Sequence, residues 1–173
     1  LPYGHGYEFW EELQIVWANA LADNFNYAEA QDVLAGLLAD VDAKTGPLNP
    51  SEAKALSSKG HNYLVQGKPQ KAVKPLEKAI KNMARRDSVQ AQIHLLTAYT
   101  RLGRFKQAAK LISTLERLIE ESVSQKNPEQ KILREKDTKH FFSLAAIEYF
   151  YMQKLRQKEG SLGTLVKMRT WLD

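Results

Sequence analysis

The 173-residue sequence predicts an all-α protein in which antiparallel helical hairpins stack on one another. Apolar residues recur at steps of three and four along most of the chain, as expected for amphipathic helices. Long alternating Val/Ile/Thr runs and Asn-Gly hairpin turns, which would indicate β-strands, are nearly absent. One pattern of small, aromatic and glycine positions also occurs three times, which is typical of a repeat protein.

Apolar periodicity and turn residues place the first three helices. The first is expected over 7–22, with one apolar stripe formed by Trp10, Leu13, Trp17 and Leu21. A turn at 23–26 separates it from a second helix, from about Tyr27 to Asp42. Pro and Gly residues at 46–50 break the chain, and Ser51 is the expected N-cap of a third helix that reaches about Gln66.

The remaining helices are bounded by glycine, proline and capping residues. Pro69 begins a helix to about Arg86, and Pro75 inside it should remove one backbone hydrogen bond and bend the axis. Asp87 or Ser88 is the expected N-cap of the next helix. The later helices are expected from there to Leu102, over 105–124, from Pro128 to about Lys158, and over 162–172.

Three segments share the same spacing of small, aromatic, turn and apolar residues, at offsets of 3, 7, 12, 16 and 19 from the first position. The first segment is Ala18, Leu21, Phe25, Ala30, Leu34 and Leu37. The second is Gly60, Tyr63, Gly67, Ala72, Leu76 and Ala79. The third is Leu96, Tyr99, Gly103, Ala108, Ile112 and Leu115. In physical terms each segment is a helical hairpin whose small residues let two helices approach closely and whose glycine reverses the chain.

These residues resemble the tetratricopeptide repeat (TPR) family, whose 34-residue unit has small, aromatic, glycine and alanine positions at this spacing. The resemblance implies a TPR-like α-solenoid, a right-handed superhelical stack in a single domain 1–173. Its units would cover about 11–44, 53–86 and 89–122, with a degenerate unit and C-terminal capping helices over 128–173. About eight extra residues at Lys44–Ser51 resemble the loop of the 42-residue, kinesin light chain-like variety of the repeat.

Residues for catalysis or metal binding are not found in any recognisable arrangement. The chain has no Cys, and none of its four His residues has a second His or a carboxylate at the helical spacing of a metalloprotease-type site. No Gly-x-Ser-x-Gly elbow or phosphate-binding loop occurs. We therefore expect a protein that is not an enzyme and that has no catalytic residues, metal or cofactor.

The charges are unevenly distributed along the chain. Residues 1–52 contain nine acidic residues and one Lys, a net charge of −8, whereas 53–173 contain 24 basic and 11 acidic residues, a net charge of +13. Part of the positive charge forms a stripe at steps of three and four, made of Lys71, Lys74, Lys78, Lys81 and Arg85. Such a stripe could bind phosphates or an anionic surface. It lacks interleaved aromatic residues for base stacking, so nucleic acid is not the favoured partner. The favoured interpretation is that the stripe is the solvated outer face of its helix.

The TPR resemblance also implies where a partner would bind, because the first helices of successive TPR units line a concave groove that holds a peptide. The positions carried over are Glu12, Ile15, Asn19, Asp23, Lys54, Ser57, His61, Val65, Gln90, Ile93, Thr97 and Arg101. Lys54 and Arg101 are the expected anchors for carboxylates of the partner. Ile15 stands where chaperone-type members have a carboxylate-clamp lysine, so a chaperone tail is not the expected ligand.

The function expected from this resemblance is a non-enzymatic interaction module, an adaptor that binds a peptide segment of a partner protein. The alternatives are a self-assembling scaffold that joins the acidic N-terminal end of one copy to the basic remainder of the next, and anionic-surface or nucleic-acid binding by the Lys71–Arg85 stripe. No apolar run of about 18 residues is present, so no transmembrane segment is expected. The absence of Cys leaves the compartment open: a cytoplasmic protein is favoured, and a processed extracytoplasmic piece is the alternative, since the chain begins at Leu1 rather than Met.

Overall fold

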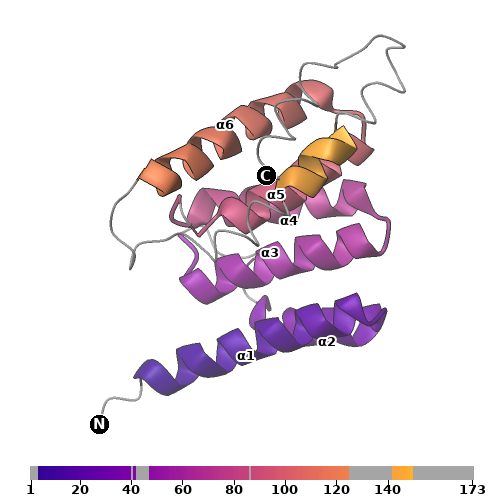
Figure 1. Ribbon diagram of the computed structural model, residues 1–173. Helices are drawn as coiled ribbons and strands as arrows, with labels where there is room; N and C mark the ends of the chain where they lie inside the picture. Colours follow the sequence, from indigo (N-terminus) through magenta and orange to yellow (C-terminus); the bar gives the residue numbers. More distant parts are fainter. Residues whose placement is uncertain (1–3, 40, 42–46, 86, 125–141, 150–173) are drawn as a thin grey trace. The chain divides into compact units, whose positions relative to one another are not determined.

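Figure 1 shows the computed structural model of the chain, which describes residues 4–39, 41, 47–85, 87–124 and 142–149. Within these ranges all regular secondary structure is helical. The helices are α1 (Gly4–Asp23), α2 (Tyr27–Leu37), α3 (Pro50–Val65), α4 (Pro69–Asn82), α5 (Val89–Arg101) and α6 (Phe105–Ser124), and residues 142–149 are also helical. Contacts divide the chain into two compact units, Leu1–Ala91 and Gln92–Asp173.

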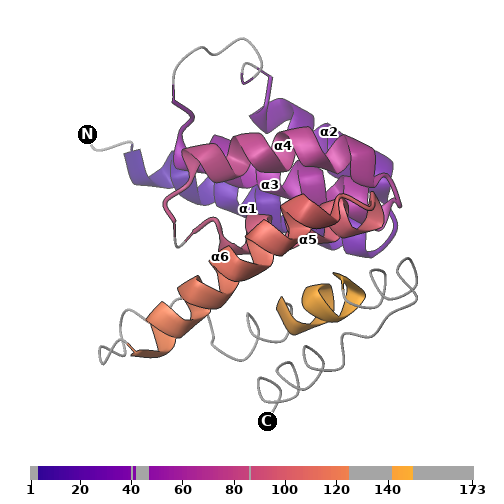
Figure 2. The ribbon, with the colours of Figure 1, turned by 90° about the horizontal axis from the view of Figure 1, so that it is seen from above.

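The first unit consists of two helical hairpins, α1 with α2 and α3 with α4 (Figures 1 and 2). Helix α3 packs against α1 and α2 as well as against α4, so that the second hairpin is stacked on the first. The apolar core at this junction contains Ile15, Ala18, Leu34, Leu38, Val41, Leu48, Ala55, Leu56 and Ala79. This is the stacked-hairpin arrangement that the repeated sequence pattern predicts.

The same chain reversal closes α1, α3 and α5. The residues with positive φ are Phe25 (64°), Gly67 (69°) and Gly103 (69°). In each turn the N–H of this residue donates to the carbonyl three residues earlier, and the next N–H donates to the carbonyl five residues earlier at 2.8 Å. This pair of bonds is the Schellman motif, which satisfies the last carbonyls of a helix and favours glycine. Phe25 therefore occupies a glycine position of the repeat.

Small residues lie where the helices approach most closely. Gly60 in α3 is buried, and a Cβ placed there would lie 2.4 Å from Cγ of Leu76 in α4. Ala30, Ala72 and Ala108 follow the three turns at the same interval, and all three have no exposed surface. The expected burial of Ala72 is confirmed, since its side chain has no exposed surface.

Helix α3 begins slightly earlier than expected. Its N-cap is Asn49, whose side chain accepts a hydrogen bond from the N–H of Glu52 at 2.7 Å, while the Glu52 carboxylate accepts from the N–H of Asn49 at 2.9 Å. Pro50 then fills the first helical position, where its missing N–H costs nothing. The expected N-cap Ser51 was wrong: Ser51 is a buried residue within the helix. The reciprocal capping box with a proline outcompetes a serine alone.

Helices α2 and α4 are shorter than expected, and the segment that follows α2 is held by side chains of α4. Helix α2 ends at Leu37 rather than near Asp42, and α4 ends at Asn82 rather than near Arg86. Lys78 Nζ donates to the carbonyl of Val41 at 2.7 Å, and Asn82 Oδ1 accepts from the N–H of Leu48 at 3.1 Å. The two ends of the inserted segment between α2 and α3 are thus both anchored on α4. Helix α4 itself runs on through Pro75.

The buried side of α1 is not the aromatic stripe of the sequence. Ile15, Ala18 and Ala22 are buried, while Trp10, Leu13 and Trp17 are exposed. The small residues of α1 therefore pack against α2 and α3, and its largest apolar residues face outward.

The second unit contains most of α5, α6 and the helical residues 142–149. Its buried side chains include Leu96, Tyr99, Ala108, Ile112, Leu115, Phe142 and Ala146. Phe105 and Tyr149 meet edge to face with ring centroids 5.9 Å apart, which fixes residues 142–149 against the start of α6. The helix expected from Pro128 to Lys158 is described only over 142–149, and the helix expected over 162–172 lies outside the described residues.

Candidate partner-binding surface

Eight of the twelve predicted binding residues lie on α1 and α3, which pack side by side in the first unit. Two side-chain contacts between described residues join the helices, an ion pair and a contact of a histidine with a carboxylate. Lys54 Nζ donates to Glu12 Oε1, and His61 Nε2 lies 3.0 Å from Asp23 Oδ1. All four of these residues belong to the predicted set, so the structure pairs its acidic members on α1 with its basic members on α3.

The Glu12–Lys54 pair is open to solvent, since both side chains are about half exposed. The hydrogen bond from Lys54, followed by the attraction of its positive charge, lowers the pKa of the Glu12 carboxyl below its ordinary value of 4.5. Glu12 is therefore ionised over the whole neutral range. Exposed pairs of this kind contribute little to stability, because solvent screens the charges and two long side chains must be held in place.

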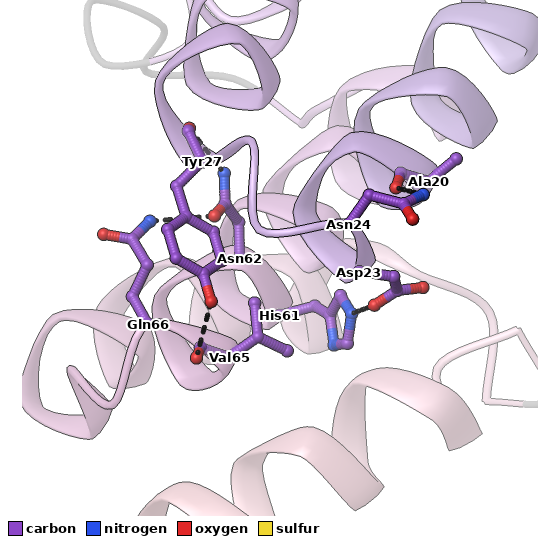
Figure 3. Close-up of polar contacts among 8 residues, drawn as sticks. All are labelled: Ala20, Asp23, Asn24, Tyr27, His61, Asn62, Val65 and Gln66. Carbon is purple, nitrogen blue, oxygen red and sulfur yellow. Dashed lines mark hydrogen bonds and ion pairs between the residues drawn. The ribbon is translucent and has the colours of Figure 1, made fainter.

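The Asp23–His61 pair lies beside a network that joins the first turn to the end of α3 (Figure 3). Tyr27 donates its hydroxyl to the carbonyl of Val65 at 3.3 Å. Asn62 is almost fully buried, and its Nδ2 donates to the carbonyl of Tyr27 at 3.4 Å, while its Oδ1 accepts from Gln66 at 2.8 Å. The network fixes the position of His61 on the surface by holding the buried side of the same helix turn.

The third group of predicted residues lies on α5. Thr97 donates its hydroxyl to the carbonyl of Ile93 at 3.2 Å, a bond within its own helix. Arg101 Nε donates to Glu148 Oε1 at 2.7 Å, so the last residue of α5 is joined to the helical residues 142–149. Glu148 was not singled out in the sequence, because the pair links positions 47 residues apart in a region without the repeat pattern.

Burial divides the predicted set into side chains that can meet a partner and side chains that cannot. Ile15, Ser57 and Ile93 are buried, and Ile15 belongs to the apolar core. They occupy the inward side of their helices, so any role of theirs in binding would be to support the exposed members of the set. The residues with exposed or partly exposed side chains are Glu12, Asn19, Asp23, Lys54, His61, Val65, Gln90, Thr97 and Arg101.

Only part of the basic stripe Lys71–Arg85 forms an exposed face of α4. Lys71, Lys74 and Lys81 are exposed on α4, but Lys78 donates to the Val41 carbonyl, and Arg85 lies beyond the end of the helix. Opposite this face, Ala72, Val73, Leu76 and Ala79 are buried. The exposed lysines thus form the solvent side of an amphipathic helix.

Neither a cluster of metal ligands nor a membrane-spanning helix occurs among the described residues. No group of three or more His, Asp or Glu side chains could hold a metal ion in those parts of the chain. None of the described helices combines the length and the apolar character needed to cross a bilayer.

Comparison with known proteins gives a likeness of fold. No protein-family model and no curated protein sequence matches the chain. Among solved structures it is similar to the crystal structure of a variant of a Podosopora anserina protein described as a kinesin light chain with nearly identical TPR-like repeats. The two share 16% sequence identity over 93% of this chain and 82% of the other, with a TM-score of 0.61. Together with the stacked hairpins and the three equivalent turns, this shows that the chain has a TPR-like, all-α solenoid fold.

Proposed function

We propose that the chain is a non-enzymatic protein–protein interaction module, which binds a peptide segment of a partner protein on the surface formed by the first helices of its hairpins. The observation that carries the proposal is the pair of side-chain contacts between α1 and α3, the exposed ion pair Glu12–Lys54 and the Asp23–His61 contact, in which His61 is partly buried. Because exposed pairs add little to folding stability, their charges can be exchanged for those of a ligand at low cost.

The arrangement favours a peptide with side chains of both charges. Acidic Glu12 and Asp23 face basic Lys54 and His61 across the two helices, so an acidic side chain of the ligand can pair with one row and a basic side chain with the other. Val65 at the end of α3 adds an exposed apolar side chain. Recognition by a few charged anchors around shallow apolar contacts is typical of peptide-binding surfaces.

The test is to pan a displayed peptide library on the folded chain and to measure the selected peptides by fluorescence anisotropy. The groove variant carries Lys54→Ala and Arg101→Ala, and we expect its affinity to fall by about tenfold or more if each anchor contributes about 1 kcal/mol. The matched control carries Lys71→Ala and Lys74→Ala, which remove the same net charge from the exposed face of α4. Loss of binding in the control but not in the groove variant would reject the proposal and favour the basic stripe.

A self-assembling scaffold is the second candidate, because residues 1–52 have a net charge of −8 and 53–173 of +13. Contacts between oppositely charged ends would weaken with added salt, since screening shortens the range of the attraction to about 8 Å at physiological ionic strength. Light scattering at low and high salt separates the candidates: assemblies that dissolve with salt would favour the scaffold.

A further inference from the structure

The outward side of α1 is an apolar face formed by Phe9, Trp10, Leu13, Val16 and Trp17. In Figure 1, α1 and α2 overlap at the edge of the first unit and α3 lies on one side of them, and α1 packs against both helices. The exposed fractions of Phe9, Trp10, Val16 and Trp17 are 64%, 61%, 64% and 56%. At 3.6 residues per turn the five residues fall within about a third of the helix circumference, and no charged residue of 9–23 falls within that arc.

In α3, the face equivalent to this apolar face of α1 packs against the preceding hairpin. Ala18 and Gly60 occupy the same repeat position 42 residues apart, which makes Leu13 equivalent to Ala55 and Val16 equivalent to Ser58. Ala55 and Ser58 are buried, and Ala55 belongs to the core formed with the first hairpin. The face that α3 uses to stack on α1 and α2 is therefore exposed on α1, where it carries larger apolar side chains.

We propose that this face binds a second copy of the chain, with α1 of the two copies antiparallel about a twofold axis at Leu13. The apolar residues are arranged symmetrically about Leu13. Phe9 and Trp10 precede it by four and three positions, and Val16 and Trp17 follow it by three and four positions. An antiparallel pair therefore places Phe9 against Trp17 of the second copy and Trp10 against its Val16, with Leu13 meeting Leu13. A twofold contact requires such a self-complementary surface.

The size of the face is sufficient for a specific dimer. A fully buried aromatic side chain covers about 150–250 Å², so the exposed parts of Phe9, Trp10 and Trp17 offer roughly 250–450 Å² in each copy. With Leu13 and Val16 the face is on the order of 500 Å², and two copies bury about 1,000 Å², near the lower limit for a specific interface. An interface at the low end of the size range is typical of a weak dimer, and we expect one that dissociates on dilution.

Charges near the axis do not oppose this pairing. Glu12 flanks the apolar face, and the twofold axis brings the Glu12 residues of the two copies close together, where like charges would repel each other. Lys54 neutralises Glu12 within each copy, so the axis joins two ion pairs rather than two free carboxylates. The other flank near Leu13 contains the uncharged Gln14.

The first test is sedimentation equilibrium of the full chain from about 0.1 to about 100 µM. The wild-type protein should change from monomer to dimer over this range, while Leu13→Glu, which places two like charges on the axis, should raise the dissociation constant more than about 100-fold. The matched control is Phe25→Glu, which puts the same charge on an exposed aromatic residue outside the face and should dimerise normally. A wild-type chain that stays monomeric throughout would overturn the proposal and leave the face to a helix of another protein.

The second test uses the absence of Cys to determine the orientation. Leu13→Cys should form a disulfide with the same residue of the second copy, whereas Phe9→Cys alone should not, because the antiparallel pair separates the two Phe9 positions by about 12 Å along the axis. An equimolar mixture of Phe9→Cys and Trp17→Cys should cross-link. Efficient self-cross-linking of Phe9→Cys would instead show a parallel pair and would overturn the twofold arrangement.

Discussion

Replacing Gly60 by Ala tests the closest approach between α3 and α4. A Cβ at this position would lie 2.4 Å from Cγ and 2.6 Å from Cδ2 of Leu76, whereas carbon atoms pack best at about 3.5–4.0 Å. Leu76 is fully buried, so it has no free space into which to turn. Overpacking of this kind costs about 1–3 kcal/mol, and we place this overlap near the upper end because three Leu76 atoms are too close.

The helix propensity of alanine offsets part of that cost. Gly to Ala in a helix interior gains about 1 kcal/mol, which leaves a net loss of about 1–2 kcal/mol for Gly60→Ala. Gly36→Ala in α2 is the matched control, because a Cβ there would meet nothing within 4 Å. The control should gain about 0.5–1 kcal/mol, so the two substitutions, identical in chemistry, are expected to have opposite signs.

The assay is urea and thermal unfolding followed by far-ultraviolet circular dichroism. Gly60→Ala should lower the midpoint temperature by about 2–8 °C and Gly36→Ala should raise it by a few degrees. Adding Leu76→Ala removes the overlapping atoms, so Gly60→Ala should cease to destabilise in that background, although Leu76→Ala itself costs about 2–5 kcal/mol. If Gly60→Ala is as stable as Gly36→Ala, the reasoning about the α3–α4 distance is wrong.

Three further predictions concern the turns, the surface pair and the core. Phe25→Gly should stabilise the protein by about 0.5–1 kcal/mol and Gly67→Ala should destabilise it by about 1 kcal/mol in urea unfolding, because both residues have a positive φ that glycine adopts without strain. Lys54→Ala should raise the pKa of the Glu12 carboxyl towards its ordinary value in an NMR titration, since Lys54 holds that pKa down; any stabilisation from the pair is present above pH 4.5 and is lost as the pH falls through the lowered pKa. Ala72→Glu would bury an unpaired charge at a site without exposed surface and should cost at least about 3 kcal/mol, so a wild-type melting curve would contradict the repeat register.

The sequence alone determined the features that depend on short-range chemistry. The turns after α1, α3 and α5 and the start of α6 at Phe105 were placed correctly, because a helix terminus is set by hydrogen bonds among neighbouring residues. Periodicity and the equivalent alanines likewise gave the hairpins and their buried small residues. The start of α3 shows the limit of this approach, since Asn49 and Ser51 are both good caps and only the complete capping box decides between them.

Only the tertiary structure decided which surfaces the helices share. Helical periodicity shows that α1 has two distinct faces. Only the packing with α2 and α3 shows that the small residues Ala18 and Ala22 are buried and that Trp10 and Trp17 are exposed. The pairing of Lys54 with Glu12 joins residues 42 positions apart. Neither result can be found by local rules, because close packing depends on the shape of the neighbouring helix, and an ion pair depends on which side chains the fold brings within reach.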